Sequence, residues 1–489
     1  MTTYLYIILA YLLVLTVFNL YRARKIKNQD DMMVAGRSLG VTRMVFTLVC
    51  TWIGSGTFIA GAEFAYRAGW SALWLPAGAW VGIFIIYFLA GKIRTFGQYT
   101  IGDILEVRYG KFARLFGAII LIIAFTTIVS YQFRAGGLIL NILTEGQLSV
   151  EFGQIIAAAF VILFVALGGM IAVAHTDLPN GIIIVLACIV ATPFVVITAG
   201  GWGAAAQVLP PGHMAIFSAD FGKYPALKGI SYFLATLMLL LGVQSMYQKF
   251  YSAKSPKEAK TAVVFWILGT IVVETVVVII AIYAATYFWQ DKSIDPAAIV
   301  LLAAKKMVPA PVGLLLLAAA CVVVISTGMN YLLSPSTNVM RDIYQRFINP
   351  NAEQERMVAY QKIFIVVIGF CAFLMIFIPT VFKLKISVLN YAYFAYTIYG
   401  VAITPALIAA LSWKRATKAG GLTSIITSAI VALVFEIVIP YGFPAVMQGG
   451  DPWGIPSIYP ALVVSISTLI IVSLLTPKPE KDVLAKIFS

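Results

Sequence analysis

The sequence predicts an all-α polytopic membrane protein, and three observations support this fold class. The chain has 489 residues, of which 61% are hydrophobic and only 11% are charged. Its mean hydropathy of +0.95 lies outside the range of soluble globular proteins. Apolar runs long enough to cross a bilayer recur along the whole chain, about thirteen in all. No soluble domain, linker or low-complexity tract is expected.

The first apolar run, 3–21, is expected to be a retained span. Basic residues follow it, at Arg22 and Arg24, whereas a cleaved signal carries them in front. Short loops separate the later runs, and 477–489 is expected to be a polar tail. The approximate limits of the thirteen runs are 3–21, 42–66, 71–91, 114–143, 152–174, 178–199, 229–250, 261–289, 310–340, 358–380, 386–412, 420–441 and 457–476.

The distribution of basic residues predicts the orientation. Of the 34 Lys and Arg, roughly 25 lie in loops that follow odd-numbered spans and about eight lie on the other side. The N-terminus is therefore expected outside and the C-terminus in the cytoplasm, as an odd number of spans requires. The net charge of +14 reflects this topology, and we expect no nucleic-acid partner.

Two groups of five spans predict an inverted repeat. The first group occupies 42–199 and the second 229–412, and 420–476 adds two peripheral helices. Each group opens with a span interrupted by glycine, at Gly54-Ser55-Gly56 and at Leu241-Gly242-Val243-Gln244-Ser245. Interrupted spans at matching positions of two halves indicate an inverted-repeat secondary transporter, because opened backbone at mid-membrane is tolerated where it lines a cavity.

Oxygen-rich positions inside apolar spans are candidates for a cation site. Ser326-Thr327 is followed by Gly328 and Asn330, which suits a hard cation, although such hydroxyls also bond back to their own helix. Asp177 opens the sixth run and is either a helix N-cap or part of a cation site, and the two roles can coexist.

Other buried polar residues leave alternatives open. Glu63 and Arg134 either pair with each other or contact a solute, and Glu274 and Glu436 are expected to be packed or partly protonated. Gln244 shares a helix face with Gln248 and either bonds neighbouring helices or lines a solute path.

The sequence carries no enzyme signature. It has no G-x-S-x-G, Walker or H-E-x-x-H motif, and its two histidines are far apart. The four cysteines lie in apolar runs without paired spacing, so neither a disulfide framework nor a metal centre is expected. We expect a protein that is not an enzyme and that uses no cofactor.

Five stretches carry a family resemblance. They are Asp31 to Gly40 with its Ala-Gly-Arg, Thr100 to Gly110, Gly168-Gly169 with Thr176-Asp177, Gln244 to Phe250 with Lys249 in place of an arginine, and Arg341 to Tyr344. In this order and spacing they resemble the sodium:solute symporters, the group of the sodium–glucose, proline, sialic acid and choline cotransporters. The resemblance covers most of the chain and implies a leucine-transporter-like five-plus-five fold with a broken first helix in each repeat.

The resemblance also implies a sodium site between the first repeat helix and the ninth span. Its ligands would be the carbonyls of Cys50, Ile53 and Val323 and the hydroxyls of Ser326 and Thr327. Some members add a second sodium near the aspartate that corresponds to Asp177. The serines of that second site are Met329 and Asn330 here, and only the Asn330 amide oxygen can partly replace them.

For the solute, the resemblance points to the broken first helix and the helices that face it. The stretch Thr51 to Gly56 is most similar to the choline branch, and an aromatic side chain there suits a quaternary ammonium. Ile128 replaces the arginine typical of sialic acid binding. The expected partners are Na⁺, the lipid bilayer and a small organic solute (an amino acid, quaternary amine, carboxylate or sugar). The candidate solute contacts are Trp52, Ser55, Thr57, Tyr131, Arg134 and Gln244.

The expected function is Na⁺-coupled symport of that solute by alternating access, in a bacterial or archaeal cytoplasmic membrane. Two alternatives share the fold. A proton-coupled carrier would titrate Asp177 or Glu63 instead of binding Na⁺, and a sensor would report solute binding to a partner protein without transport.

Overall fold

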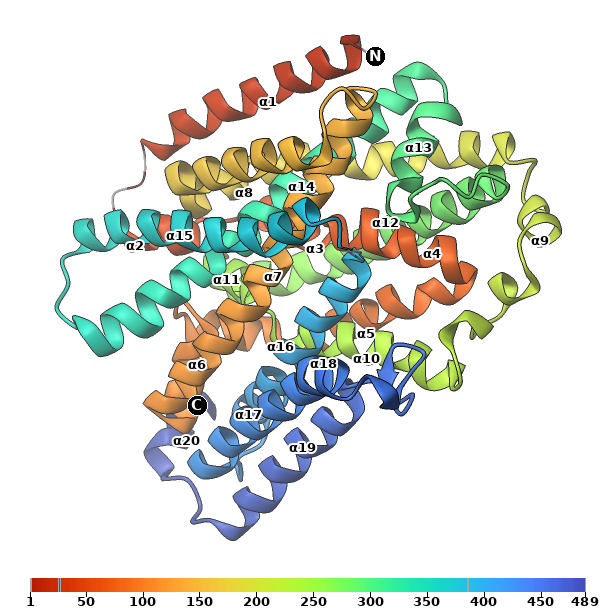
Figure 1. Cartoon of the computed structure of the whole chain (residues 1–489). Helices are drawn as coiled ribbons and strands as arrows, with labels where there is room; N and C mark the ends of the chain where they lie inside the picture. Colours follow the sequence, from red (N-terminus) through yellow and green to blue (C-terminus); the bar gives the residue numbers. More distant parts are fainter. Residues whose placement is uncertain (1, 25, 27, 385–386, 489) are drawn as a thin grey trace.

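The computed structural model describes residues 2–24, 26, 28–384 and 387–488, and it consists of helices packed side by side (Figure 1). Within these residues, ten helices are long and apolar enough to cross a membrane, and Leu5–Tyr21 and Val41–Trp52 are shorter apolar helices. Large apolar side chains are exposed on the outer helices, as expected where they face lipid. The predicted all-α polytopic fold class is confirmed.

The first repeat follows an N-terminal helix. α3 and α4 are the two halves of the interrupted span 42–66, and α6 lies in the loop 92–114. The elements of this half are α1 (Thr2–Ala23), α2 (Gln29–Val34), η1 (Ala35–Arg37), α3 (Val41–Trp52), η2 (Gly56–Gly61), α4 (Ala62–Ala68), η3 (Gly69–Leu73), α5 (Trp74–Phe96), α6 (Ile101–Tyr109), α7 (Lys111–Leu143) and α8 (Val150–Thr198).

The long helix α8 reverses direction at Gly169, whose backbone (φ 51°, ψ −160°) is not helical. Two contacts with α1 show the reversal. Asn19 donates to the carbonyl of Phe164 at 2.9 Å, and Tyr11, two turns earlier in α1, donates to Asn180 at 2.6 Å. A helix that continued straight through Gly169 would carry Asn180 away from Tyr11. The expected spans 152–174 and 178–199 are therefore joined at Gly169, before the predicted loop.

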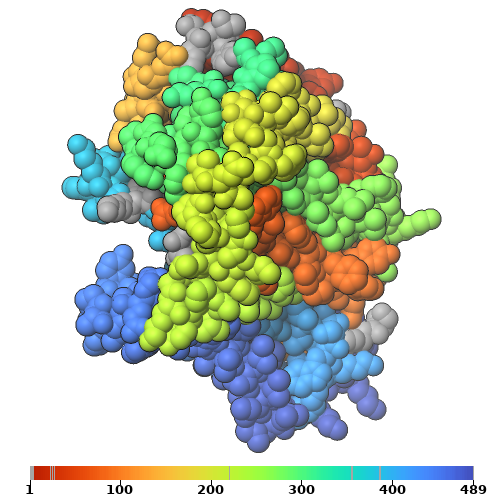
Figure 2. Space-filling model, turned by 90° about the vertical axis from the view of Figure 1, so that its right-hand side faces the viewer, coloured from red at the N-terminus to blue at the C-terminus, as the bar shows by residue number. Residues whose placement is uncertain are grey.

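The second repeat and the C-terminal helices follow a short connecting segment. Figure 2 shows this segment, in yellow-green, across the middle of one face of the molecule. The elements are α9 (Ala204–Val208), η4 (Pro211–Met214), η5 (Ala219–Phe221), α10 (Pro225–Gly242), α11 (Gln244–Ser252), α12 (Pro256–Phe288), η6 (Pro296–Ala298), α13 (Ile299–Lys306), α14 (Ala310–Asn338), η7 (Val339–Ile348), α15 (Gln354–Val381), α16 (Val388–Ser412), α17 (Lys418–Leu433), η8 (Val434–Val438), α18 (Ile439–Gly442), η9 (Pro444–Val446), β1 (Met447–Gln448), β2 (Asp451–Pro452), α19 (Ile458–Leu475) and α20 (Lys481–Phe488).

Both repeats open with a helix that is broken by extended backbone. After α3, Ile53 has φ −74° and ψ 98°, and after α10, Val243 has φ −65° and ψ 116°. Each extended residue removes the following amides from the helical ladder, so carbonyls near it lose their partners. The breaks fall where the glycine interruptions predicted them, at matching places in the two repeats.

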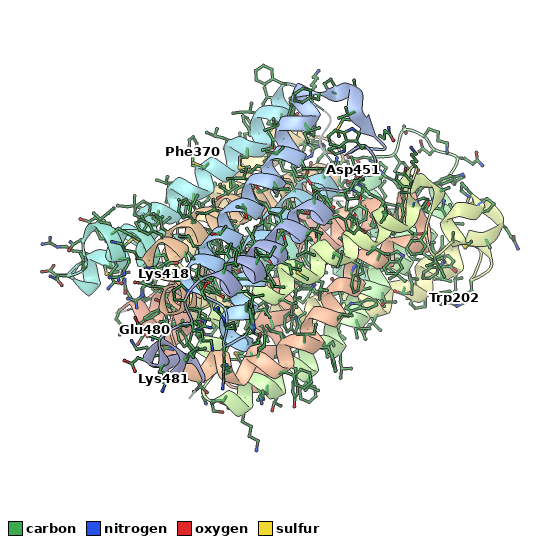
Figure 3. The ribbon with its side chains drawn as sticks, turned by 90° about the horizontal axis from the view of Figure 1, so that it is seen from below. Trp202, Phe370, Lys418, Asp451, Glu480 and Lys481 are labelled. Carbon is green, nitrogen blue, oxygen red and sulfur yellow. The ribbon has the colours of Figure 1, made fainter. Side chains whose placement is uncertain are left out.

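The two ends of the bundle differ in content. Figure 3 places Asp451 and Trp202 toward one end, and Lys418, Glu480 and Lys481 toward the opposite end. We call the first the hairpin end, after β1 and β2, which pair antiparallel with Gln448 opposite Asp451. The second is the α20 end. α14 and α16 lie inside the bundle with 78% of their apolar windows buried, against 28% for the peripheral α19.

Candidate ion and solute site

The break after α3 faces α14 through one hydroxyl. The Oγ1 atom of Thr327 lies 2.9 Å from the carbonyl oxygen of Cys50 and 3.0 Å from that of Ile53. All three residues are buried. Because Ile53 is extended, these carbonyls are left open toward α14. A Cβ atom on Gly54 would lie 2.7 Å from Thr327 Cγ2, so only glycine permits this approach.

Asp177 connects the same place to α8. Its carboxylate accepts hydrogen bonds from Ser326 at 2.5 Å, from Thr47 at 2.6 Å and from Asn330 at 3.3 Å. These donors come from α14 and α3, so one carboxylate joins both repeats. Asp177 lies about two turns inside the helical stretch that follows Gly169, so the N-cap interpretation is wrong.

A buried lysine completes this cluster. The ammonium group of Lys249, only 1% exposed, donates to the amide oxygen of Asn330 and to the sulfur of Met170 at 3.0 Å. The amide oxygen of Asn330, predicted as a possible ligand of a second sodium, therefore already accepts a hydrogen bond from a positively charged group. In the sequence, Lys249 stood out only as the lysine that replaces an arginine in the stretch Gln244 to Phe250. Val323 lies one turn before Thr327 in α14 and is buried.

On the other side of the break lies a small cavity of about 30 Å³, room for one or two water molecules. The indole nitrogen of Trp52 donates to one carboxyl oxygen of Glu274 at 2.9 Å, and that of Trp80 donates to the other at 2.8 Å. The sequence predicted a packed or partly protonated Glu274, and the structure places this residue in the cavity wall. The lining residues are Trp52, Gly56, Thr57, Gly61, Ala72, Leu75, Pro76, Thr236, Glu274, Val278 and Tyr396.

Two further groups beside the cavity lack partners. The backbone N–H of Ser55 donates to Gln132 Oε1 at 3.2 Å. Within the described residues, Ser55 Oγ and Gln132 Nε2 are buried and make no hydrogen bond. A Cβ atom on Gly56 would lie 2.7 Å from the Tyr396 hydroxyl and 3.6 Å from that of Tyr131. The expected residues Trp52, Ser55, Thr57 and Tyr131 therefore gather here, together with Gln132 and Tyr396, which sequence reasoning missed.

Two expected solute residues lie elsewhere. Gln244 accepts from the Ile101 amide at 2.7 Å and donates to the Tyr99 carbonyl at 3.3 Å, so it holds the start of α6. Arg134 reaches the Thr380 hydroxyl at 3.5 Å. Neither residue lines the cavity.

The expected pair of Glu63 with Arg134 is not formed. Glu63 instead pairs with Arg67, one turn along α4, at 2.8 Å. Glu436 accepts from Ser457 near the hairpin end, away from the cavity around Glu274. Glu63 also accepts from Ser387, at the start of α16, at 3.2 Å, so both glutamates hold structural contacts outside the cavity.

Three aromatic rings pack against one another toward the hairpin end. The rings of Phe64 and Tyr232 are 4.5 Å apart, and those of Tyr232 and Tyr393 are 5.2 Å apart. All three rings also line a hollow of about 1050 Å³ that lies beyond them. Asp451 beside this hollow pairs with Lys228 at 2.6 Å. Burial raises the pKa of Asp451, and the ammonium group of Lys228 opposes that rise.

Ion pairs close the α20 end. Arg114 contacts Asp103 at 2.8 Å, Glu106 at 2.7 Å and Asp342 at 2.6 Å, and so ties α6 and α7 to η7. Burial opposes ionisation of Glu106, but hydrogen bonds from Arg346 and Arg114 outweigh it and lower its pKa.

The family model "Sodium:solute symporter family" matches residues 32–428. The chain belongs to this family. Relatives named sodium/proline symporter, from Staphylococcus aureus strains bovine RF122 / ET3-1 and JH9, are each 26% identical over 97% of this chain and 93% of their own length.

Solved structures share the fold of this family member. A substrate-bound, outward-open Na⁺-coupled sialic acid symporter aligns with a TM-score of 0.82 at 17% identity, over 98% of both chains. The nucleobase-cation-symport-1 family transporter Mhp1 aligns with a TM-score of 0.60 at 12% identity, over 94% of this chain and 99% of its own. The five-plus-five inverted-repeat core is thereby confirmed. The separate count of thirteen spans stays a prediction.

Family membership gives the general function. The chain is a multi-pass membrane transporter that couples the movement of a small organic solute to Na⁺ by alternating access, and it is not an enzyme. A proton-coupled carrier and a solute sensor are not favoured.

Proposed function

We propose that one Na⁺ binds where the break after α3 meets α14. Its ligands are the carbonyls of Cys50, Ile53 and Val323 and the hydroxyls of Ser326 and Thr327. The observation that carries this proposal is the contact of Thr327 Oγ1 with the two open carbonyls at 2.9 and 3.0 Å. A hard cation prefers such oxygen ligands, and carbonyls at an unwound helix are its usual source in this kind of fold.

A Na⁺ at this position links the two repeats. α3 belongs to the first repeat and α14 to the second, so the ion stabilises the arrangement in which they meet. That arrangement favours solute binding in the adjacent cavity. The inward movement of one charge contributes roughly 2.3 kcal/mol per 100 mV of membrane potential, and this energy drives solute accumulation together with the Na⁺ gradient.

We infer that the ammonium group of Lys249 takes the place of a second cation beside Asp177 and Asn330. Lys249 donates to Asn330, whose amide nitrogen donates to Asp177. A fixed ammonium group at this place makes a second Na⁺ unnecessary. Coupling to one Na⁺ per cycle follows.

The hairpin end faces the outside and the α20 end faces the cytoplasm, in a bacterial cell membrane. The basic loops support this orientation, because Lys418 and Lys481 lie toward the α20 end (Figure 3). The N-terminus is then outside and the C-terminus inside. The ion pairs of Arg114 form the cytoplasmic closure and the rings of Phe64 and Tyr232 form the outer one.

The solute is a small organic molecule that enters the cavity between Trp52, Thr57 and Tyr396. The relatives named sodium/proline symporter support an amino acid, and the aromatic walls also suit a quaternary amine. Ser55 Oγ and Gln132 Nε2 offer unsatisfied hydrogen-bonding groups to it. The cavity is small, so its walls move apart when the solute binds.

Uptake into proteoliposomes tests the ion site. Labelled proline, choline, pyruvate and glucose are compared at fixed pH with Na⁺ or K⁺ outside. We expect Na⁺-stimulated uptake of at least one of them, and its loss in the double variant Ser326→Ala, Thr327→Ala. The matched control is Thr427→Ala with Ser428→Ala, two adjacent hydroxyls that bond back to their own helix α17. Uptake that remains Na⁺-dependent in the site variant contradicts the assignment.

A further inference from the structure

The cavity holds one carboxyl group without a positive partner. Glu274 is 5% exposed, and its two oxygens accept only the indole N–H groups of Trp52 and Trp80. Among the described residues, no Lys, Arg or His nitrogen lies within ion-pair distance of it. A carboxyl group inside a membrane bundle is costly, and such groups face a partner or a solute path.

Three basic residues of the bundle contact groups other than Glu274. Lys249 donates to Asn330 and Met170, Arg67 pairs with Glu63, and Arg134 reaches Thr380. Among the described residues, no basic side chain pairs with Glu274, so an ionised Glu274 takes its complementary charge from outside the protein. The Na⁺ position proposed above lies on the opposite face of the helix break, toward Thr327, whereas Trp52 turns its indole toward Glu274.

The surroundings of Glu274 suit an organic cation. Two indole N–H donors hold the carboxyl group in one orientation and leave its remaining lone pairs toward the cavity. Trp52 and Tyr396 add aromatic surface to the same small space. Aromatic faces attract ammonium groups, and this attraction grows where water is excluded. No carboxylate-binding arginine lines the cavity among the described residues.

We propose that the transported solute carries a positively charged nitrogen and that Glu274 is its counter-ion. The class includes quaternary amines and zwitterions such as amino acids, and it excludes sugars and simple carboxylates. The proposal rests on the solute-binding role assigned to this cavity. Glu274 then acts as a specificity-determining residue, while the Na⁺ ligands on the other face of the break do not distinguish solutes.

Thermal stabilisation of the purified full-length protein in Na⁺ or K⁺ tests the proposal. The panel contains cationic, zwitterionic, neutral and anionic metabolites. It includes two matched pairs, choline with 3,3-dimethylbutan-1-ol and proline with cyclopentanecarboxylate, in which only the nitrogen cation is removed. We expect Na⁺-dependent stabilisation by solutes with a cationic nitrogen, and at least tenfold weaker binding of their partners without it.

The variant Glu274→Gln keeps the shape of the side chain and one of the two indole hydrogen bonds, because its amide oxygen accepts an indole N–H and its amide nitrogen does not. We expect it to lose the preference for the nitrogen cation at least tenfold and to keep the stabilisation by Na⁺ alone, which also reports a folded protein. The matched control is Glu436→Gln, a half-buried glutamate away from the cavity, which should keep the preference.

The outcomes separate this proposal from the proposed ion site. The role of Glu274 is overturned if the strongest binder is neutral or anionic, or if no cationic or zwitterionic solute binds. It is also overturned if Glu274→Gln keeps the preference for the nitrogen cation. Loss of any Na⁺ effect in the wild type, with the preference for the nitrogen cation intact, instead overturns the Na⁺ coupling.

Discussion

The two faces of the break after α3 are built in different ways. On the ion face, which comprises Cys50, Ile53, Thr327 and Asp177, the polar groups have hydrogen-bond partners. Thr327 donates to the two backbone carbonyls, and Asp177 accepts three hydrogen bonds. The solute face keeps Ser55 Oγ and Gln132 Nε2 without partners, and the Glu274 carboxyl group without a cation. A hard ion needs a rigid set of oxygens, whereas a solute needs groups that are satisfied only after it arrives.

This difference predicts where the chain tolerates change. Substitutions on the ion face should weaken Na⁺ binding and every activity that depends on it. Substitutions on the solute face should alter solute affinity and selectivity while Na⁺ still binds.

The largest effect is expected for Gly54→Ala. The added Cβ atom would lie 2.7 to 3.0 Å from three atoms of Thr327, a short side chain that cannot move away without leaving the carbonyls. We expect at least a 100-fold loss of Na⁺ affinity, measured by isothermal titration. The control is Gly269→Ala in α12, where the nearest atom would lie at 3.4 Å. An unchanged Na⁺ affinity in Gly54→Ala would show that Na⁺ binding does not require the close approach of Thr327 to Gly54.

Asp177→Asn should have the next largest effect. An amide nitrogen cannot accept the hydrogen bonds that one carboxylate oxygen takes from Thr47 and Asn330. Hydrogen bonds to charged groups contribute about 1.5–3 kcal/mol each, so we expect Na⁺ to bind ~10-fold more weakly and the protein to melt at lower temperature. Asp295→Asn serves as the control, because asparagine caps a helix as well as aspartate does. Equal Na⁺ affinities in the two variants would exclude Asp177 from the ion face.

Gly56→Ala should act on the solute face alone. Its Cβ atom meets the Tyr396 hydroxyl, the far end of a flexible side chain, so the cavity narrows without a rigid clash. We expect the solute KM to rise ~5-fold, because a group of this size changes binding by about 1 kcal/mol, and Na⁺ binding to stay at its wild-type value. Loss of Na⁺ binding in this variant would mean that the two faces are not independent.

The smallest effect is expected at the α20 end, outside both faces. Arg346 and Arg114 lower the pKa of Glu106, so its ionised form stabilises the fold above the ordinary carboxyl pKa of 4.5. That stability is lost as the pH falls through the lowered folded-state value. Glu106→Gln should therefore cost about 1 kcal/mol near pH 7 and progressively less below pH 4.5.

Thermal unfolding of Glu106→Gln at neutral and acid pH measures this difference. The exposed Glu353, paired with Arg356 on the surface, provides the control substitution Glu353→Gln, which should have no measurable effect. A Glu106→Gln difference that grows as the pH falls would reverse the assigned sign.

The two faces also differ in how far the sequence predicted them. Gly54 and Ser326-Thr327 are local motifs inside apolar runs, so the broken helix and its facing hydroxyls could be recognised without coordinates. Glu274 and Trp80 are single residues in different helices, and nothing in their spacing shows that they meet. Their contact depends on the packing of α5 against α12, which helical periodicity does not specify.

Two further residues show the same limit. Gln244 was expected in the solute path because it lies near the second break, but the structure turns its side chain toward α6. Lys249, five residues later, was visible only as a variation of a motif. Its partner Asn330 lies in α14, and no motif or spacing predicts that the two side chains meet. Side-chain direction at a helix break depends on φ and ψ values that composition does not reveal.

Equilibrium binding of ²²Na⁺ to the purified protein, in the absence of solute, tests the central claim most directly. The wild type should bind one Na⁺ per chain. The double variant Ser326→Ala, Thr327→Ala should bind none, and Glu274→Gln should bind as the wild type does. Wild-type ²²Na⁺ binding in the double variant, or its loss in Glu274→Gln, would contradict an ion face and a solute face on opposite sides of one helix break.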